Sequence, residues 1–185
     1  MKTGTKSVLF GVHQFLLHPM FVAMAWWIIY RELPRPHELV AIVTHDLGYW
    51  GAPDMDGPEG EAHPERMAAW WNRHFGAFGR RVAVEILGHS RSHARKNNLP
   101  LSRLCYPDKL STALYPRWLY LLLANLSGEI HEYMRLCQDG KYTDVIKVAK
   151  TQTQWIIETQ AHMALMGLHG DSYPPKASDI QGEHA

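Results

Sequence analysis

Apolar side chains recur every three to four positions through most of the chain, and no stretch alternates polar and apolar residues as a half-buried strand does. Segments 49–62 and 91–107 are rich in glycine, proline or charge and are predicted loops. The chain is therefore predicted to be all-α, one compact bundle of about six to eight helices over residues 1–170 with a polar tail over 171–185. Helices are predicted over 6–16, 19–33, 37–46, 64–75, 80–90, 108–114, 116–137 and 143–168.

The stretch Val8–Tyr30 is nearly long and apolar enough to span a bilayer. His13, Gln14 and His18 interrupt it with polar groups, and Pro19 breaks it in the middle. No basic segment and cleavage site of a signal peptide surround it. A buried pair of helices is therefore predicted here, and no contact with a membrane.

Composition and charge narrow the class of protein. With 46% hydrophobic and 20% charged residues the chain is expected to fold. Its 19 Lys and Arg against 18 Asp and Glu give a net charge of +1, so no nucleic acid polymer or anionic membrane is expected as a partner. Cys105 and Cys137 form no CxxC pair, which favours a reducing, cytoplasmic setting. The 12 histidines exceed what a core needs and point to a functional site.

Imidazoles and carboxylates recur near the predicted helix ends. Histidine and aspartate without a thiolate suit Fe, Mn, Ni, Co, Mg or Zn rather than a structural zinc finger. Two such ions would activate a water molecule and bind a phosphoryl oxygen. Gly48 is predicted to end the helix over 37–46, so that the adjacent His45 and Asp46 can reach one site. The series is His18, His45, Asp46, His63, His89 and Asp108.

Five short motifs resemble, in the right order, those of the HD-domain superfamily. LHPMFVA at 17–23 is similar to its opening helix, and IVTHDLG at 42–48 to the His-Asp pair that names it. His63 and ILGH at 86–89 follow as in binuclear members, and YPDKLS at 106–111 resembles the closing aspartate motif. The resemblance covers about residues 8–125 and implies an HD-type helical bundle.

The resemblance also implies a set of metal ligands and an activity. Asp46 would bridge two divalent ions, the first held also by His18, His45 and Asp108 and the second by His63 and His89. Most of the superfamily are metal-dependent phosphohydrolases acting on nucleotides or other phosphate esters. A small branch uses a mixed-valent di-iron centre to oxygenate substrates such as inositol or organophosphonates. Tyr49 stands where cyclic dinucleotide phosphodiesterases and inositol oxygenases tend to carry lysine, which argues against those two activities.

Other residues are candidates for catalysis and substrate binding. Asp46, Lys109 and His93 are the predicted catalytic residues, with His93 a substrate or supporting group rather than a ligand. Arg91, Arg95 and Lys96 form either a cationic rim for a phosphate or carboxylate, or a solvated basic loop. Tyr49 and Trp50 either stack on a ring of the substrate or anchor the core. The loop 49–62 is expected to cover the site.

The remaining histidines and the apolar residues of the second and last helices receive weaker assignments. The roles of His13 and His74 are undecided. The methionines and tryptophans of the second and last helices are expected to belong to the core or to an oligomer interface, so a homo-oligomer is possible. Three hypotheses for a small phosphorylated or anionic substrate follow: a binuclear phosphohydrolase, a di-iron oxygenase, and a non-catalytic metal-binding regulatory protein. No site role is assigned to His37, His131, His162, His169 and His184.

Overall fold

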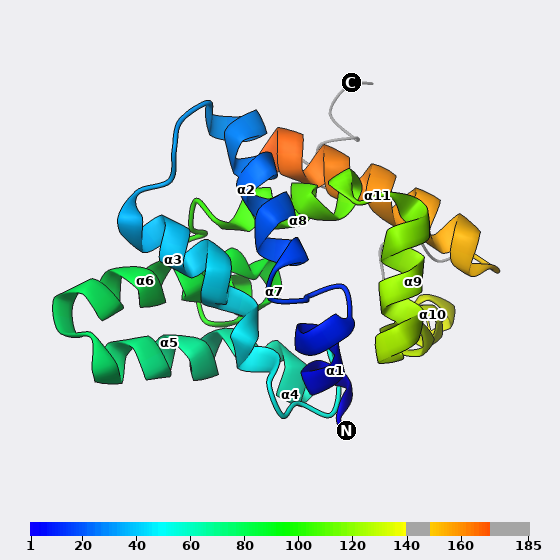
Figure 1. Cartoon of the computed structure of the whole chain (residues 1–185), viewed down its shortest axis with the longest axis horizontal. Helices are drawn as coiled ribbons and strands as arrows, with labels where there is room; N and C mark the ends of the chain where they lie inside the picture. The colour runs from blue at the N-terminus through cyan, green and yellow to red at the C-terminus, as the bar shows by residue number, and fades with distance from the viewer. Residues whose placement is uncertain (140–148, 171–185) are drawn as a thin grey trace, which may run out of the picture.

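A computed structural model describes residues 1–139 and 149–170, and in these residues every regular element is a helix (Figure 1). The protein is therefore all-α, as its sequence predicts. The predicted tail over 171–185 lies outside the described residues. The α-helices are α1 Thr3–Phe10, α2 Leu17–Tyr30, α3 Pro36–Thr44, α4 Pro58–Glu61, α5 His63–His74, α6 Gly76–His89, α7 Arg91–Lys96, α8 Cys105–Leu114, α9 Arg117–Ser127, α10 Glu129–Gln138 and α11 Gln152–His169, and a 3₁₀ helix, η1, covers His45–Tyr49.

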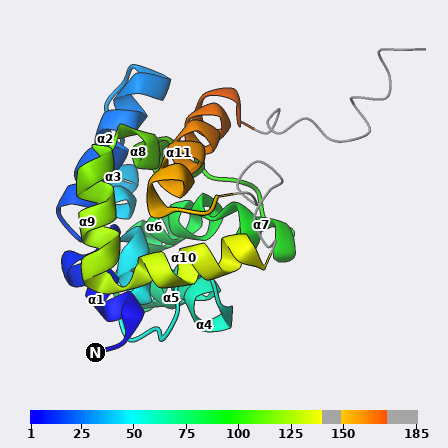
Figure 2. The ribbon, with the colours of Figure 1, turned by 90° about the vertical axis from the view of Figure 1, so that its right-hand side faces the viewer.

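Two clusters of buried apolar side chains hold these helices together. One lies among α2, α3, α5 and α6, where Trp26, Ile42 and Ile86 are at most 1% exposed. The other joins α1, α9, α10 and α11 and includes the fully buried Ile130. The turn between α5 and α6 and the group of α9 and α10 accordingly lie at opposite ends of the molecule (Figures 1 and 2). Leu47 of η1 packs against both clusters, so η1 lies between the two cores.

Gly128 divides the segment that the sequence predicts as one helix over 116–137. Its φ of +88° lies in the left-handed region, which side chains with a Cβ disfavour. α9 therefore ends at Ser127 and α10 begins at Glu129, and the prediction of one continuous helix is wrong. The break places the carboxylate of Glu129 inside the protein, where it is completely buried.

Segment 91–107 is a second correction, because only its middle part, 97–104, is the loop that its composition predicts. It contains α7 and the first residues of α8. Ser90 caps α7, and its Oγ accepts a hydrogen bond of 3.3 Å from the backbone N–H of His93. A helix of six residues has too few apolar positions to reveal a period, and its basic residues conceal it further.

The other boundaries differ from the predictions by shorter distances. α1 begins earlier than the predicted helix over 6–16 and ends sooner. α2 begins two residues before Pro19, which puts His18 in its first turn. The predicted loop 49–62 contains α4 as a single helical turn. α11 begins later than predicted, and residues 143–148 of the predicted last helix lie outside the described ones.

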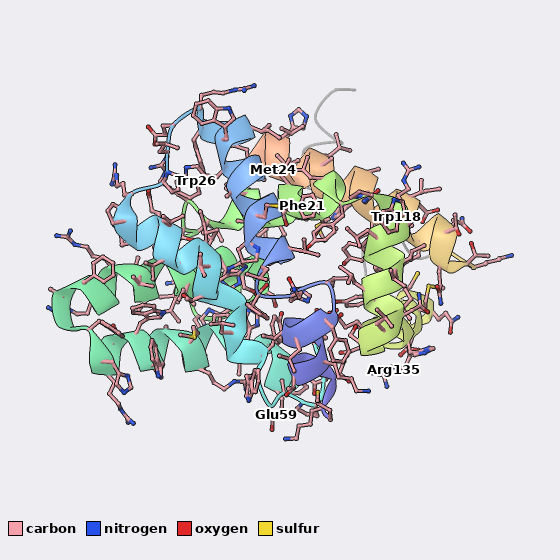
Figure 3. The ribbon with its side chains drawn as sticks, in the orientation of Figure 1. Phe21, Met24, Trp26, Glu59, Trp118 and Arg135 are labelled. Atoms are coloured by element: carbon pink, nitrogen blue, oxygen red, sulfur yellow. The ribbon has the colours of Figure 1, made fainter. Side chains whose placement is uncertain are left out.

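The apolar stretch Val8–Tyr30 is divided between α1 and α2 and does not form one long helix. On α2, Phe21 and Trp26 are buried, whereas Met24 and Trp27 are 47% and 50% exposed (Figure 3). One-sided burial of this kind is typical of a helix that covers a globular core. No helix in the described part of the chain is long and apolar enough to cross a membrane.

Candidate metal centre

The side chains predicted as metal ligands come together between the two cores. Each stands at or near a helix end, so that the six reach one point from five elements. At most 8% of any of them is exposed. They are His18 in the first turn of α2, His45 and Asp46 in η1, His63 at the start of α5, His89 at the end of α6 and Asp108 in the first turn of α8.

The first group of donors is made by His18, His45, Asp46 and Asp108. His18 Nε2 lies 3.2 Å from His45 Nε2, 3.1 Å from Asp108 Oδ1 and 3.0 Å from Asp46 Oδ2. His45 Nε2 lies 3.2 Å from the same Asp46 oxygen. α3 ends at Thr44, and the 3₁₀ turn that follows lets two adjacent side chains reach one point. Donor atoms this close together could hold a metal ion.

The second group uses the other oxygen of Asp46. Oδ1 lies 3.7 Å from His63 Nε2 and 3.9 Å from His89 Nε2, and these two nitrogens are 3.1 Å apart. These three side chains could also hold a metal ion. Asp46 therefore belongs to both groups, with one oxygen turned to each.

Three histidines of the centre are oriented by the backbone in the same way. In His45, Nδ1 lies 3.0 Å from the carbonyl oxygen of Ile42, and in His63 it lies 2.7 Å from that of Gly60. His89 repeats the arrangement with the carbonyl three residues before it. A carbonyl only accepts, so Nδ1 carries the hydrogen and a neutral ring directs the lone pair of Nε2 into the centre. Metal-binding histidines are oriented by such hydrogen bonds.

The donor set fits a metal ion. His63 and His89 direct two Nε2 atoms at each other, and as neutral rings both would be acceptors. Asp46 Oδ2 is buried and has no hydrogen-bond partner. Buried acceptors without a partner are costly, and a cation between them would satisfy both sets. Imidazole and carboxylate donors suit Fe, Mn, Ni, Co, Mg or Zn.

His45 of the first group and the two histidines of the second differ in pKa, and therefore in their protonation near neutral pH. Burial lowers the pKa of His45, but the carboxylates of Asp46 and Asp108 outweigh it and raise that pKa to about 10. Burial and the nearby charge of His45 lower the pKa of His89 to about 4. Burial and the neighbouring His89 hold the pKa of His63 well below its usual range. Near neutral pH, an ion must therefore displace a proton from the first group but not from the second.

η1 also builds the wall of the centre beside His63. Tyr49 stacks on His63, with ring centroids 3.8 Å apart and planes 19° apart. Gly48 packs against the same residue, because a Cβ there would lie 2.0 Å from the carbonyl oxygen of His63. Gly48 lies within η1 without a positive φ, so close approach, and not a helix cap, explains this glycine.

The predicted substrate-binding residues Arg91, Arg95 and Tyr49 and the predicted catalytic residue Lys109 line a polar cavity over the centre. Arg91, Arg95 and Lys109 share this cavity of about 650 Å³ with the ligands His63 and His89. Lys109 Nζ also lies 2.8 Å from a carboxylate oxygen of the adjacent ligand on α8. These cations could bind an anionic group of a substrate at the metal centre.

Three other predicted residues point elsewhere. His93 Nε2 lies 3.1 Å from Glu65 Oε1, and Lys96 Nζ lies 3.8 Å from Glu61 Oε2. Neither is among the residues that line the polar cavity. Trp50 is 59% exposed and lines a separate groove with other tryptophans, and Tyr49 is not among the residues that line it. Only Tyr49 of the two predicted aromatic residues therefore faces the centre.

Sequence analysis missed a second, apolar cavity beside the ligands. It has a volume of about 310 Å³ and adjoins the centre at His18, Asp108 and Lys109. His162, which has no role in the sequence-based assignment, lines both cavities, and Met55 brings the predicted covering loop into the wall. The residues from α9 to α11 were missed because helical spacing marks them only as core. They are Tyr120, Tyr133, Trp155, Thr159, Met163 and Met166.

His13, undecided from the sequence, is held beside the centre by a buried carboxylate. Its Nδ1 lies 2.9 Å from Glu129 Oε1, and its ring centroid lies 5.5 Å from that of His18. Burial lowers the pKa of His13, but Asp46 and Glu129 outweigh it and raise that pKa to about 9. The same glutamate accepts hydrogen bonds from Ser7 Oγ at 2.6 Å and from Tyr133 Oη at 3.2 Å.

Comparison with protein-family models, with curated proteins and with solved structures finds no match to this chain. The resemblance to the HD-domain superfamily therefore rests on the motifs themselves. What the described residues establish is a buried cluster of histidine and aspartate side chains that could hold metal. Its ions, its reaction and its family stay predictions.

Proposed function

We propose that this protein is a binuclear, metal-dependent phosphohydrolase of the HD type. The observation that carries the proposal is the division of Asp46, whose two oxygens face two separate groups of donors. A carboxylate shared in this way suits two ions about 3.5–4 Å apart, the separation found in phosphatases and nucleases. The motif order that resembles the HD-domain superfamily supports the same assignment.

The residues around the centre have complementary tasks in this reaction. Bound ions would supply an activated water molecule and neutralise charge on a phosphoryl group. Arg91 and Arg95 bind the phosphate oxygens in the polar cavity, and Lys109 contributes a further charge at the junction with the apolar cavity. Asp46 would be a ligand of both ions, so that water and phosphate would meet at one place in the centre.

Metal loading and a panel of phosphate esters test this proposal. Protein purified without chelator is expected to contain about two ions per chain by elemental mass spectrometry. With Mn²⁺, Co²⁺, Ni²⁺ or Mg²⁺ it should hydrolyse at least one phosphomonoester of the panel. Asp46→Asn should lose both the ions and the activity, and His74→Asn, an exchange of an exposed histidine on α5, should keep them. Full hydrolysis by the Asp46→Asn protein would overturn the proposal.

The donor set supports one alternative, a di-iron oxygenase acting on a small polar or phosphonate-like substrate. Four imidazoles and two carboxylates also suit iron, and the second group is rich in nitrogen donors. Iron as the native metal, together with oxygen uptake that a candidate substrate stimulates, would select this alternative. Two tightly bound ions without either activity would favour a metal-binding regulatory protein.

A further inference from the structure

The two cavities at the metal centre differ in chemistry and share a wall. The polar cavity contains Arg91 and Arg95, and the apolar cavity contains neither. Tyr49, Asp108 and Lys109 line both, so the two cavities meet at the ligands. A molecule bound at the centre can therefore reach into both.

The part of the apolar cavity that is not shared with the polar one is bounded mostly by aromatic and sulfur-containing side chains. Tyr133 and Trp155 stack on each other with ring centroids 5.2 Å apart and planes 10° apart. Tyr120 and Met55 add further buried apolar surface. A cavity of about 150 Å³ lined by apolar side chains binds benzene, so a chamber of 310 Å³ has room for a substituted ring.

The charged side chains favour an anion in the polar cavity and not in the apolar one. Among the described residues that line the apolar cavity, Lys109 is the only lysine or arginine. It stands beside Asp108, where the two cavities meet. Asp56 and Asp108 line both cavities, whereas Arg91 and Arg95 line the polar one alone. A phosphate in the unshared part of the apolar cavity would therefore meet no arginine among the described lining residues, whereas a ring there would meet aromatic side chains.

We infer that the substrate is a phosphomonoester with an aromatic or similarly bulky apolar organic group. The phosphate lies at the metal centre between Arg91 and Arg95, and the organic group lies in the chamber between α8, α9, α10 and α11. This inference rests on the proposed function for the phosphate and on the shape of the apolar cavity for the organic group.

Binding of two non-hydrolysable probes tests the inference without turnover. Phenylphosphonate and methylphosphonate carry the same anionic group, and they are titrated calorimetrically into metal-loaded protein. Burial of the ring should make phenylphosphonate bind at least about tenfold more tightly. Equal affinities would overturn the inference and leave the phosphohydrolase proposal standing. Failure of both probes to bind, together with an inactive phosphate panel, would overturn both.

A variant that fills the apolar cavity tests whether the ring of phenylphosphonate binds there. Thr112 lines the apolar cavity and is not among the residues that line the polar one, so Thr112→Phe should reduce the preference for the ring at least about tenfold with little effect on methylphosphonate. Thr153→Phe makes the same exchange at an exposed position of α11 and serves as the control. An unchanged preference in Thr112→Phe would place the ring elsewhere and overturn the inference.

A second variant covers the case in which Thr112→Phe does not fold, judged by its circular dichroism. Tyr120→Leu removes one aromatic face of the chamber and adds no volume. It should lower the affinity for phenylphosphonate several-fold and leave that for methylphosphonate unchanged. Parallel losses for both probes would show that the chamber does not hold the ring.

Discussion

The two halves of the candidate metal centre share Asp46 but are supported in different ways. Around the first half the surrounding groups are charged: Lys109 Nζ lies 2.8 Å from Asp108, and the His13–Glu129 pair stands beside His18. In the second half both histidines are held by backbone carbonyls, as His45 is in the first, but the neighbouring group is the uncharged ring of Tyr49, stacked on His63.

The difference affects what each half does without an ion. In the first half, protonated His45 partly balances the charge of the carboxylates of Asp46 and Asp108, although Asp46 Oδ2 still has no hydrogen-bond partner. In the second half, the low pKa values of His63 and His89 leave neutral rings with two acceptors facing each other. The first half therefore releases a proton when it binds an ion. In the second half, an ion becomes the partner that the two facing Nε2 acceptors lack.

Removal of the shared ligand should have the largest effect. Asp46→Ala takes one oxygen from each half, so both ions should be lost. Metal-ion catalysis contributes several kcal/mol, so hydrolysis should fall by about a thousandfold or more. Elemental analysis and phosphatase assays measure the two effects, and retention of one tightly held ion would show that Asp46 does not serve both halves.

Removal of a ligand from one half should weaken binding of the ion in that half and leave the other ion bound. His89→Ala is expected to lose the second ion and keep the first, whereas His18→Ala should weaken the first. The ratio of ions to protein should fall from about two to about one in His89→Ala, a mononuclear centre with at least about tenfold lower activity. Loss of both ions in His89→Ala would mean that the halves bind cooperatively and are not separate sites.

Breaking the charged support of the first half should cost stability. Glu129→Gln keeps the size of the side chain but places an amide NH₂ among donors such as Ser7 Oγ and Val12 N–H. Unsatisfied buried groups of this kind cost about 1–3 kcal/mol each, so urea denaturation should show a loss in that range. Glu59→Gln, at an exposed glutamate, is the control and should change stability little. Equal stabilities would mean that the carboxylate is not needed there.

Sequence predicted the cluster of candidate ligands far better than its surroundings. His45 and Asp46 stand out because adjacent donors at a helix end form a local pattern, and Pro19 and Pro64 mark helix starts beside His18 and His63. These features lie within a few residues of each other, where spacing carries information.

The missed features depend on long-range contacts. Tyr133 and Trp155 have the helical spacing of ordinary core residues, and only the turn at Gly128 and the packing of α11 bring them to the centre. His13 and Glu129 are separated by 116 residues, so no local pattern joins them. Single-sequence reasoning therefore finds donors at helix ends, but not the walls of the cavity that distant helices build.

Lower pH should weaken ion binding in the first half much more than in the second. The proton held by His45, with a pKa of about 10, competes with the first ion throughout the neutral range, so affinity there should fall about tenfold for each unit of pH lost. His89, with a pKa of about 4, is already neutral above pH 5, so the affinity of the second half should stay nearly flat. Titrations of Zn²⁺ or Mn²⁺ at pH 6, 7 and 8 measure both slopes, and parallel slopes would remove the distinction.

The smallest expected effect concerns the ring that supports the second half. Tyr49→Leu removes the stacked face from His63 but leaves Nδ1 of that histidine donating to the Gly60 carbonyl. Because the backbone hydrogen bond still orients the imidazole, the affinity for the second ion should fall only several-fold, less than the 10–100-fold typical of supporting groups around a metal. Competition with a fluorescent chelator measures the two affinities separately, and His131→Leu, at an exposed position of α10, is the control. A loss as large as that in His89→Ala would mean that the aromatic ring, and not the backbone, positions His63.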